Sequence, residues 1–286
     1  MTTAYLNGEL MPLTEARISP MDRGFLFGDG VYEVIPSYGG TPVAMQYHLE
    51  RLRHSLECIQ LCSGHSDESL SKLVHALIEA NEGGNLGIYL HISRGPEEKR
   101  QHAFSEPASP TTFAYTFPIN QPSDGTAETA QRFTVITQLD QRWGRCHIKS
   151  TALLGNVLHM MDAVGQGAQE VLLFNERDEL TEAAACNVFV VQEGKILTPP
   201  LDHEKLPGVT RRQCLEFLAD HTDWAVEVRP VLREEVMQAD EIWLSSSTKE
   251  LAPVVTVDGN MVADGKPGPF WSAAQQLFHR YRFDSP

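Results

Sequence analysis

Hydrophobic positions in the first 117 residues alternate in some segments and recur at helical spacing in others. Alternation on either side of the turn pairs Asn7-Gly8 and Gly39-Gly40 predicts two antiparallel strand pairs. Apolar residues recur every three or four positions in residues 48–60, which predicts a helix, and Ser66 with the two acidic residues after it predicts the start of another. The expected elements are a hairpin at residues 5–12, a second hairpin whose first strand is residues 31–38, helices at residues 48–60 and 66–81, and strands at residues 86–93 and 113–117.

A polar run rich in Pro, Ser and Gly at residues 118–125 separates this region from the rest of the chain. We therefore predict an α+β protein with a small α+β domain at residues 1–118, a linker at residues 119–125 and a larger, mixed α/β domain at residues 126–286. In the larger domain, strands are expected at residues 132–138, 171–175, 188–192, 196–198, 241–245 and 254–257, and helices near Thr151, Thr210, Arg233 and Pro269. The sequence lacks the glycine motifs of dinucleotide-binding and Walker-type proteins, so no usual sequence motif indicates nucleotide binding.

Charge and composition narrow the class of protein. The 286 residues include 38 acidic and 23 basic ones, and the net charge of −15 repels nucleic acid at long range. No stretch approaches the ~20 apolar residues of a membrane-spanning helix, and the N-terminal residues lack a basic segment followed by an apolar one. We therefore expect a soluble, cytoplasmic protein that binds neither nucleic acid nor a membrane, and the cysteine spacing predicts no metal site.

Lys149 differs from the other lysines of the chain. Each of the other six has an Asp or Glu within five positions, whereas Lys149 lies in the segment HIKSTALLG, among apolar or small neighbours, between a predicted strand and a predicted helix. Such a setting could desolvate the ammonium and make the amine a usable nucleophile. A lysine that reaches solvent from the start of a helix would explain the same residues, so a chemical role stays open at this point.

Three further segments could bind an anion or a cofactor. Gly208, Val209 and Thr210 lead into a predicted helix, so free backbone N–H groups and a hydroxyl could point at an anion. Four hydroxyl residues, 245–248, follow the end of a predicted strand, where loops commonly hold ligands. Glu182 lies just before another predicted strand and is followed by three alanines. A helix cap, a polar loop and a surface turn are the plain structural alternatives.

Taken together, five segments resemble the successive blocks of the class IV aminotransferases. They are residues 22–34 (DRGFLFGDGVYEV), 147–158 (HIKSTALLGNVL), 180–189 (LTEAAACNVF), 206–211 (LPGVTR) and 245–253 (SSSTKELAP). Their order and spacing match over nearly the whole chain, which is far more specific than any single motif.

The resemblance implies fold type IV of the pyridoxal-phosphate enzymes, with a small and a larger domain and a homodimer whose active sites lie near the interface. Lys149 matches the Schiff-base lysine of the family, and Glu182 matches the carboxylate that pairs with the pyridine nitrogen. The other matching cofactor residues are Arg51 for the phosphate, Val209, Thr210, Ser246 and Ser247 for the phosphate cradle, and Leu206 for support of the ring. One departure is the run Ala183 to Cys186, where the family often has hydroxyl residues.

The segment HISRGPEEKRQHAF distinguishes members of the family. Arg100 and His102 form an R-x-H pair that resembles the substrate-carboxylate trap of D-amino acid transaminases, which Tyr32 completes. In that family the pair reaches across from the partner subunit. The loop from Arg94 to Arg100 is one residue longer than the family pattern, which makes Arg94 an alternative to Arg100.

These residues imply transamination between D-amino acids, such as D-alanine and D-glutamate, and 2-oxo acids, such as 2-oxoglutarate and pyruvate. Lys149 would act as the base at the substrate Cα, and a second 2-oxo acid would complete a ping-pong exchange. Transamination of branched-chain L-amino acids or of (R)-amines, and an aminodeoxychorismate lyase reaction, are the alternatives, because they use the same lysine.

Overall fold

Both kinds of hydrophobic pattern correspond to real elements in the computed structural model, which describes residues 2–285. The chain divides into two units, each with its own core. Residues 2–121 and 148–153 form the first unit, and residues 122–147 and 154–285 form the second. Within residues 2–285, every helix is too short or too polar to cross a lipid bilayer.

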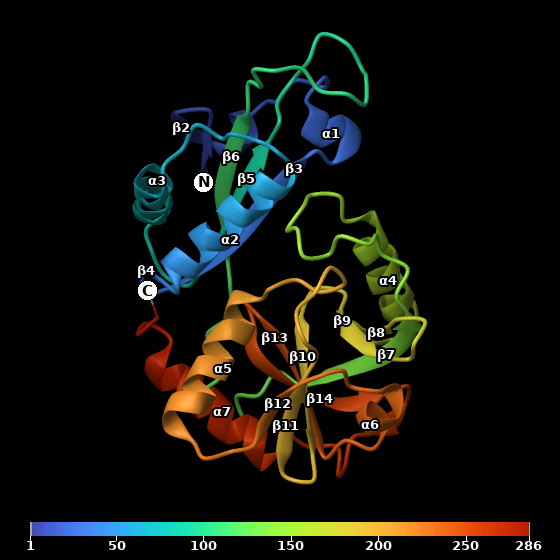
Figure 1. Ribbon diagram of the computed structural model, residues 1–286. Helices are drawn as coiled ribbons and strands as arrows, with labels where there is room; N and C mark the ends of the chain where they lie inside the picture. Colours follow the sequence, from blue (N-terminus) through green and yellow to red (C-terminus); the bar gives the residue numbers. More distant parts are fainter. Residues whose placement is uncertain (1, 286) are drawn as a thin grey trace. The chain divides into compact units, whose positions relative to one another are not determined.

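The first unit is an antiparallel sheet of six strands in the order β2-β1-β6-β5-β3-β4, with helices α2 and α3 packed on one face (Figure 1). Leucines and isoleucines from both helices and from the central strands are buried together, as the helical spacing predicted. The strands are β1 (Thr3–Leu6), β2 (Glu9–Pro12), β3 (Gly30–Tyr38), β4 (Thr41–Pro42), β5 (Leu86–Ser93) and β6 (Thr111–Pro118). The helices are η1 (Leu13–Glu15), α1 (Arg23–Phe27), α2 (Met45–Cys58) and α3 (Asp67–Ala80), the last capped by Ser66.

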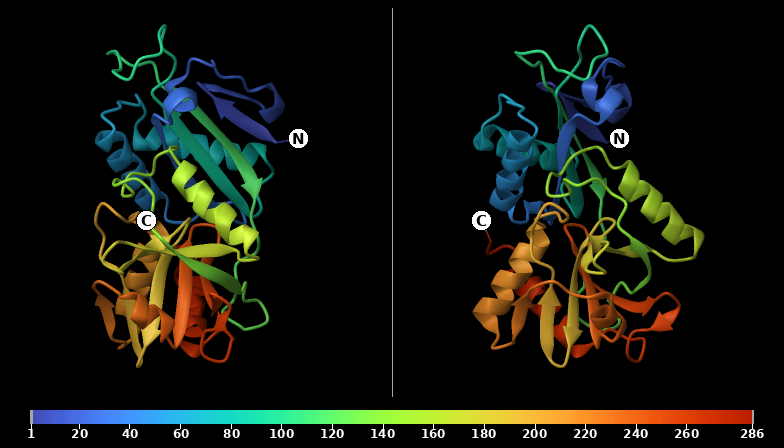
Figure 2. Two further views of the ribbon diagram at one scale, coloured as in Figure 1. Left: turned by 90° about the vertical axis from the view of Figure 1, so that its right-hand side faces the viewer. Right: turned by 45° about the vertical axis from the view of Figure 1, so that its right-hand side comes forward.

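The second unit is a mixed sheet of nine strands in the order β12-β11-β10-β13-β14-β7-β8-β9, with β15 paired to β14. Helices α5 and α7 cover one face through an aromatic core that includes Trp243 and Trp271 (Figure 2). The strands are β7 (Phe133–Leu139), β8 (Glu170–Phe174), β9 (Leu180–Ala183), β10 (Asn187–Gln192), β11 (Lys195–Thr198), β12 (Val226–Val228), β13 (Glu241–Ser246), β14 (Glu250–Val257) and β15 (Asn260–Met261). The helices are α4 (Leu154–Gly165), α5 (Val209–His221), α6 (Arg233–Met237) and α7 (Pro269–Tyr281).

The segment with Lys149 is part of the first unit, although the expected boundary at residues 119–125 assigned it to the second domain. Its backbone pairs with the start of β3: Tyr32 N–H donates to Lys149 O at 3.0 Å, and Thr151 N–H donates to Gly30 O at 3.0 Å. A β-bridge joins Val31 and Ser150 between them. The chain therefore returns to the first unit for six residues before it continues into α4.

Candidate active site

Glu182 is buried in the second unit, where three donors converge on its carboxylate. It lies within the short strand β9, shortly before the predicted strand that forms β10, and 4% of its surface is exposed. Its Oε1 accepts a hydrogen bond from the Arg142 guanidinium at 2.5 Å. Its Oε2 accepts from Asn187 Nδ2 and from the Leu206 N–H, each at 3.0 Å. Because every one of these partners is a donor, these hydrogen bonds favour the ionised carboxylate.

Arg142 is a partner of Glu182 that the sequence analysis missed. Its side chain is 3% exposed, and its Nε and its second terminal nitrogen bond the two oxygens of Asp140 at 3.0 and 2.7 Å. The Thr181 hydroxyl donates to the same Asp140 carboxylate at 2.7 Å. The sequence signal is only an Asp and an Arg two positions apart after a strand, a pattern without a specific meaning until the fold brings it to Glu182.

For both carboxyls of this cluster, burial raises the pKa and Arg142 lowers it, with a different net result for each. Burial raises the pKa of Glu182 above its usual value, against the lowering effects of Arg142 and of the Leu206 N–H. Burial also acts upward on Asp140, but hydrogen bonds and charge from Arg142, together with the Thr181 hydroxyl, hold its pKa below the usual value. When both carboxyls are ionised, two negative charges and one positive charge leave a net charge of −1. A cation beside Glu182 would balance it.

Asn187 links Glu182 to the start of α5. Its Nδ2 donates to Leu206 O at 2.9 Å as well as to Glu182. A Cβ on Gly208 would lie 1.9 Å from Asn187 Oδ1, so this close approach requires glycine. Helix α5 begins directly afterwards with Val209, and no side chain in the described part of the chain caps its first turn. The first backbone N–H groups are therefore suited to an anion.

Hydroxyl groups end the strand β13 next to this helix start. Ser245 stands opposite Asn187 in the register of β10 and β13, is 2% exposed, and has an Oγ with no hydrogen-bond partner within residues 2–285. Because paired residues project from the same face, Ser245 shares the face on which Asn187 approaches Gly208. Ser246 and Ser247, which the sequence predicted, follow it. A buried hydroxyl without a partner beside a helix N-terminus matches the needs of a phosphate group.

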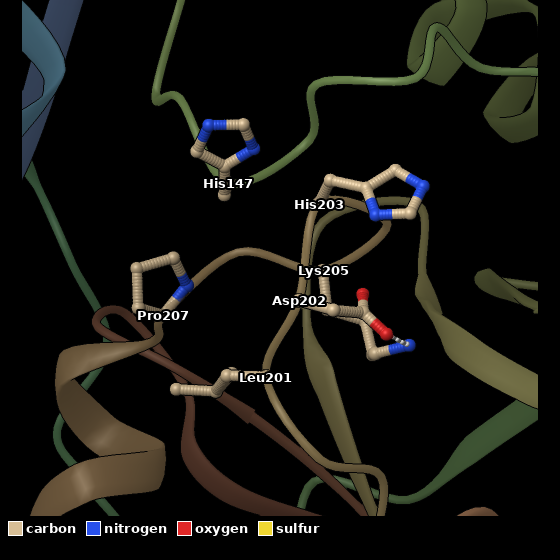
Figure 3. Close-up of a pocket in the computed structure, with 6 residues that line it drawn as sticks. All are labelled: His147, Leu201, Asp202, His203, Lys205 and Pro207. Atoms are coloured by element: carbon tan, nitrogen blue, oxygen red, sulfur yellow. Dashed lines mark ion pairs between the residues drawn. The ribbon is translucent and has the colours of Figure 1, made fainter. Parts of the chain in front are cut away.

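A pocket of the second unit opens beside the loop that carries Leu206, as Figure 3 shows. The residues that line it are His147, Leu201, Asp202, His203, Lys205 and Pro207. Lys205 is 5% exposed, and its ammonium lies 2.8 Å from Asp202 and 3.7 Å from Glu204. The pocket thus contains a buried lysine whose charge is already neutralised by two carboxylates.

Lys149 in the first unit has a fixed backbone and a side chain with few partners. Its N–H donates to Ser55 Oγ at 3.2 Å and its carbonyl accepts from Tyr32. Its Nζ lies 4.3 Å from the centre of the Tyr32 ring, a cation–π contact. Among residues 2–285, no hydrogen bond or ion pair of the ammonium accompanies this contact. An amine that no anion holds is free to react.

Arg51 is held by buried partners on the same unit. It projects from α2 to the carboxylate of Glu33, with two contacts of 2.8 Å, and His48 Nδ1 lies 2.7 Å from the same carboxylate. Glu33 is fully buried, and Arg51 and His48 are 8% and 1% exposed. Arg51 thus has a fixed orientation, because a bidentate pair allows its planar guanidinium little rotation.

Arg100 and His102 lie on the exposed loop between β5 and β6, against one aromatic ring. The Arg100 guanidinium lies 4.9 Å from the centre of the Phe27 ring, and the His102 ring centre lies 5.5 Å from it. Arg23 supports the loop by donating to the carbonyls of Gln101 and His102 at 2.7 and 2.9 Å. The two side chains are therefore neighbours and both remain accessible.

Arg94 does not fit the alternative role given to it in the sequence analysis. It is 3% exposed, and its guanidinium bonds both oxygens of Asp29 at 2.9 and 3.2 Å. It also donates to the carbonyls of Ile59 and Gln60 at 2.6 and 3.2 Å. Arg94 is thus occupied in the core of the first unit, which leaves Arg100 as the accessible arginine of this loop.

Comparisons with known proteins identify the family of the chain. The pattern of the family described as amino-transferase class IV matches residues 30–257. The D-alanine aminotransferase of Staphylococcus haemolyticus is 36% identical over 282 residues, which cover 98% of each chain, and that of Bacillus licheniformis is 36% identical over 270 residues, which cover 94% of this chain and 93% of the relative. The crystal structure of the Escherichia coli branched-chain amino acid aminotransferase superposes with a TM-score of 0.90 at 24% identity, and covers 99% of this chain and 95% of its own.

The chain belongs to the class IV aminotransferases, and the predicted α+β fold of type IV is confirmed. It is an aminotransferase that uses pyridoxal phosphate, like the family. The residues of each unit fit that group. In the second unit, the net negative charge around Glu182 suits a protonated ring nitrogen, and the start of α5 with the buried Ser245 hydroxyl suits the phosphate. In the first unit, the amine of Lys149, which no anion holds, suits the aldehyde.

Proposed function

We propose that the chain exchanges amino groups between D-amino acids, such as D-alanine and D-glutamate, and 2-oxo acids, such as 2-oxoglutarate and pyruvate. The D-alanine aminotransferases that share 36% identity over nearly the full length support this substrate class. The structural observation that carries it is the pair Arg100 and His102 on Phe27, because an accessible guanidinium beside an imidazole can bind a carboxylate. The likeness to branched-chain aminotransferases, below 25% identity, bears on the fold alone.

We assign the cofactor contacts as follows. Pyridoxal phosphate, when bound, supplies an aldehyde for the amino group and a ring that withdraws electrons. Lys149 would bind the aldehyde group, and Glu182 would hold a proton at the ring nitrogen. The phosphate is bound by Arg51 and by the strand and helix ends, and Leu206 supports the ring. The residues of these ends are Val209, Thr210, Ser246 and Ser247, to which Ser245 is added for its buried hydroxyl.

Lys149 is also the proton carrier of the reaction. Its amine would remove the proton from the substrate Cα and would carry it within the site during the amino transfer. Tyr32 keeps the amine close through the face of its ring, 4.3 Å from Nζ, and takes part in binding the substrate carboxylate with Arg100 and His102. A second 2-oxo acid then reverses these steps, which gives a ping-pong exchange.

A homodimer is part of this proposal, with Arg100 and His102 serving the substrate of the partner subunit. Support comes from α4, which exposes apolar side chains along one face at helical spacing. The exposed residues are Leu154, Val157, Leu158, Met161 and Val164, at 70, 51, 58, 59 and 54%. An apolar stripe of this kind is typical of a surface that another chain covers.

A substrate panel tests the proposal. The purified protein is given 2-oxoglutarate with D-alanine, L-alanine, L-leucine or a carboxylate-free (R)-amine, and separately aminodeoxychorismate, with Lys149→Ala as a blank. We expect D-alanine to exceed L-leucine by about a hundredfold or more in kcat/KM. A preference for L-leucine would replace the proposal by branched-chain transamination. Release of pyruvate from aminodeoxychorismate without amino transfer would replace it by the lyase reaction.

A further inference from the structure

The carboxylate of Glu182 has a limited number of places for a further hydrogen bond. A carboxylate offers about two acceptor positions on each oxygen. Both positions of Oε2 are taken, by Asn187 Nδ2 and by the Leu206 N–H, each at 3.0 Å. Oε1 accepts from Arg142 alone among the described residues, which leaves one position on that oxygen. Any further donor must therefore share Oε1 with the Arg142 guanidinium.

Asp140 fixes the orientation of the Arg142 guanidinium through two hydrogen bonds. Two of its nitrogens bond the two oxygens of Asp140, and the third reaches Glu182. Asp140 is in turn held by the Thr181 hydroxyl and by the Arg142 backbone N–H at 3.0 Å. The guanidinium also donates to Glu204 O at 3.1 Å. Because the planar guanidinium is fixed along one edge by Asp140, its remaining nitrogen can point in one direction only, toward Glu182. A lysine ammonium has no such fixed geometry.

Charge gives Arg142 a second effect on Glu182. Without this cation, two buried carboxyls would lie together, and one of them would take up a proton. Asp140 keeps a 10% exposed side chain, whereas that of Glu182 is 6% exposed, and burial already raises the pKa of Glu182. Glu182 is therefore the carboxyl that would lose its charge.

We propose that Arg142, held by Asp140, is the positioning residue that keeps Glu182 ionised and directs the open position of Oε1 to the protonated ring nitrogen of the cofactor. This inference rests on the proposed role of Glu182. In the parent protein, the negative Asp140 and Glu182, the positive Arg142 and a protonated ring sum to zero charge. Arg142 thus acts on the cofactor only through Glu182.

Two forms of the cofactor separate this role from a purely structural one. The full-length apoprotein is titrated with pyridoxal phosphate and with its carbocyclic analogue, in which C–H replaces the ring nitrogen, and the ratio of the two dissociation constants is taken. The ratio isolates the contact at the nitrogen, because the aldehyde and the phosphate are the same in both. We expect the parent to prefer pyridoxal phosphate by about tenfold or more, as for a charged hydrogen bond.

Four variants complete the experiment. Glu182→Gln and Arg142→Gln are each expected to lose most of this preference, and Arg142→Lys is expected to keep part of it. Arg282→Gln is the matched control, because it also removes a buried arginine that pairs with a carboxylate, Glu250 at 2.9 Å, and has no contact with Glu182. It should destabilise the protein and keep the parental ratio.

The outcomes distinguish the two levels of the argument. If Glu182→Gln keeps the parental ratio, the proposed pairing of Glu182 with the ring fails. If Glu182→Gln loses the preference and Arg142→Gln keeps it, or weakens both forms equally, the inference about Arg142 is overturned. If Arg142→Gln does not fold, Arg142→Lys decides: a ratio equal to the parental one contradicts the positioning role, and a reduced ratio supports it.

Discussion

Glu182 and Lys149 have opposite surroundings, each within its own unit. The carboxylate of Glu182 accepts three hydrogen bonds, and its strongest partner, Arg142, is itself bound on two sides. The Lys149 backbone is fixed by Tyr32 and Ser55, while within residues 2–285 its ammonium contacts the face of the Tyr32 ring and makes no hydrogen bond or ion pair. The side chain of Glu182 is therefore fixed up to its carboxylate, whereas Lys149 is fixed at its backbone only.

The difference follows from what each group has to do in the proposed reaction. A charge that stabilises the ring nitrogen is most effective when it is oriented in advance, because no reorganisation is then needed during the reaction. An amine that binds the aldehyde, leaves it and carries a proton must change its position several times. Rigid surroundings therefore suit Glu182, and a fixed backbone with a mobile side chain suits Lys149.

The largest effect that the comparison predicts is at Lys149. Lys149→Ala should lower transamination by a factor on the order of a thousand or more, because the amine and the proton carrier disappear together. Borohydride reduction followed by peptide mapping should find the cofactor on residue 149 of the parent and on no lysine of the variant. Lys205→Ala is the control: Lys205 is buried but paired with Asp202, so the adduct at Lys149 should persist. An adduct on Lys205 or any other lysine of the parent would contradict the assignment.

A second prediction concerns the exposed loop of the first unit. Arg100→Ala should reduce the stabilisation of the transition state for D-alanine by about 2 to 4 kcal/mol, because the substrate carboxylate loses a cationic partner. A carboxylate-free (R)-amine has nothing to lose at this position. The measurement is kcat/KM for both substrates. Arg17→Ala is the control, because Arg17 is an exposed arginine that donates to the nearby carbonyls of Thr14 and Ala16. Equal losses on both substrates would mean that Arg100 acts through the fold or through dimer contacts.

A third prediction tests the rigid side of the comparison. Glu182→Gln preserves the shape of the side chain and removes its charge, so the cofactor should stay bound while transamination slows by about tenfold or more. Single-turnover kinetics with D-alanine, followed by the absorbance of the cofactor, measure this step directly. The pairing of Glu182 with the ring would be wrong if the variant stayed within a factor of about two of the parent, roughly 0.4 kcal/mol of barrier.

The smallest effect is on stability and comes from His48 beside Glu33 and Arg51. Burial lowers the pKa of His48 below its usual value, against the raising effect of Glu33 and with a further lowering from Arg51 and Lys149. The unfolded chain therefore binds a proton at a higher pH than the folded one, and stability falls as the pH drops below about 6.5. We expect a decrease of a few degrees in the unfolding midpoint between pH 7 and pH 5.

The control for this effect is His48→Gln, whose unfolding midpoint should depend less on pH over the same interval. The carboxyl of Glu33 does not compensate, because His48 and Arg51 hold its pKa far below the usual value in spite of burial. It stays ionised over the whole interval, and its contribution to stability is lost only at much lower pH. An equal pH dependence in parent and variant would show that His48 does not titrate in this range.

Local sequence patterns predicted the helices and strands well, but they did not predict the side-chain networks of the site. Ser66 with its acidic neighbours gave the correct start of α3, and residues 86–93 form β5 as expected. The short strand β9 was missed, because four residues show too little alternation for recognition. Arg142 was missed because its meaning comes from Glu182, 40 positions away in the chain. Lys149 was singled out as a residue without nearby acids, and its role stays a prediction. Its pairing with Tyr32 in β3 depends on tertiary structure, which local patterns do not show.

The return of residues 148–153 to the first unit limits how this protein could be recombined with its relatives. A chimaera that exchanged residues 2–121 as one cassette would take β3 from one parent and its Lys149 partner strand from the other. The backbone hydrogen bonds to Gly30 and Tyr32 would then join segments that come from two different parents. Crossovers on both sides of residues 148–153 would keep the Lys149 segment with β3, the strand to which it is hydrogen-bonded. The module to exchange is therefore discontinuous in the sequence although it forms one structural unit.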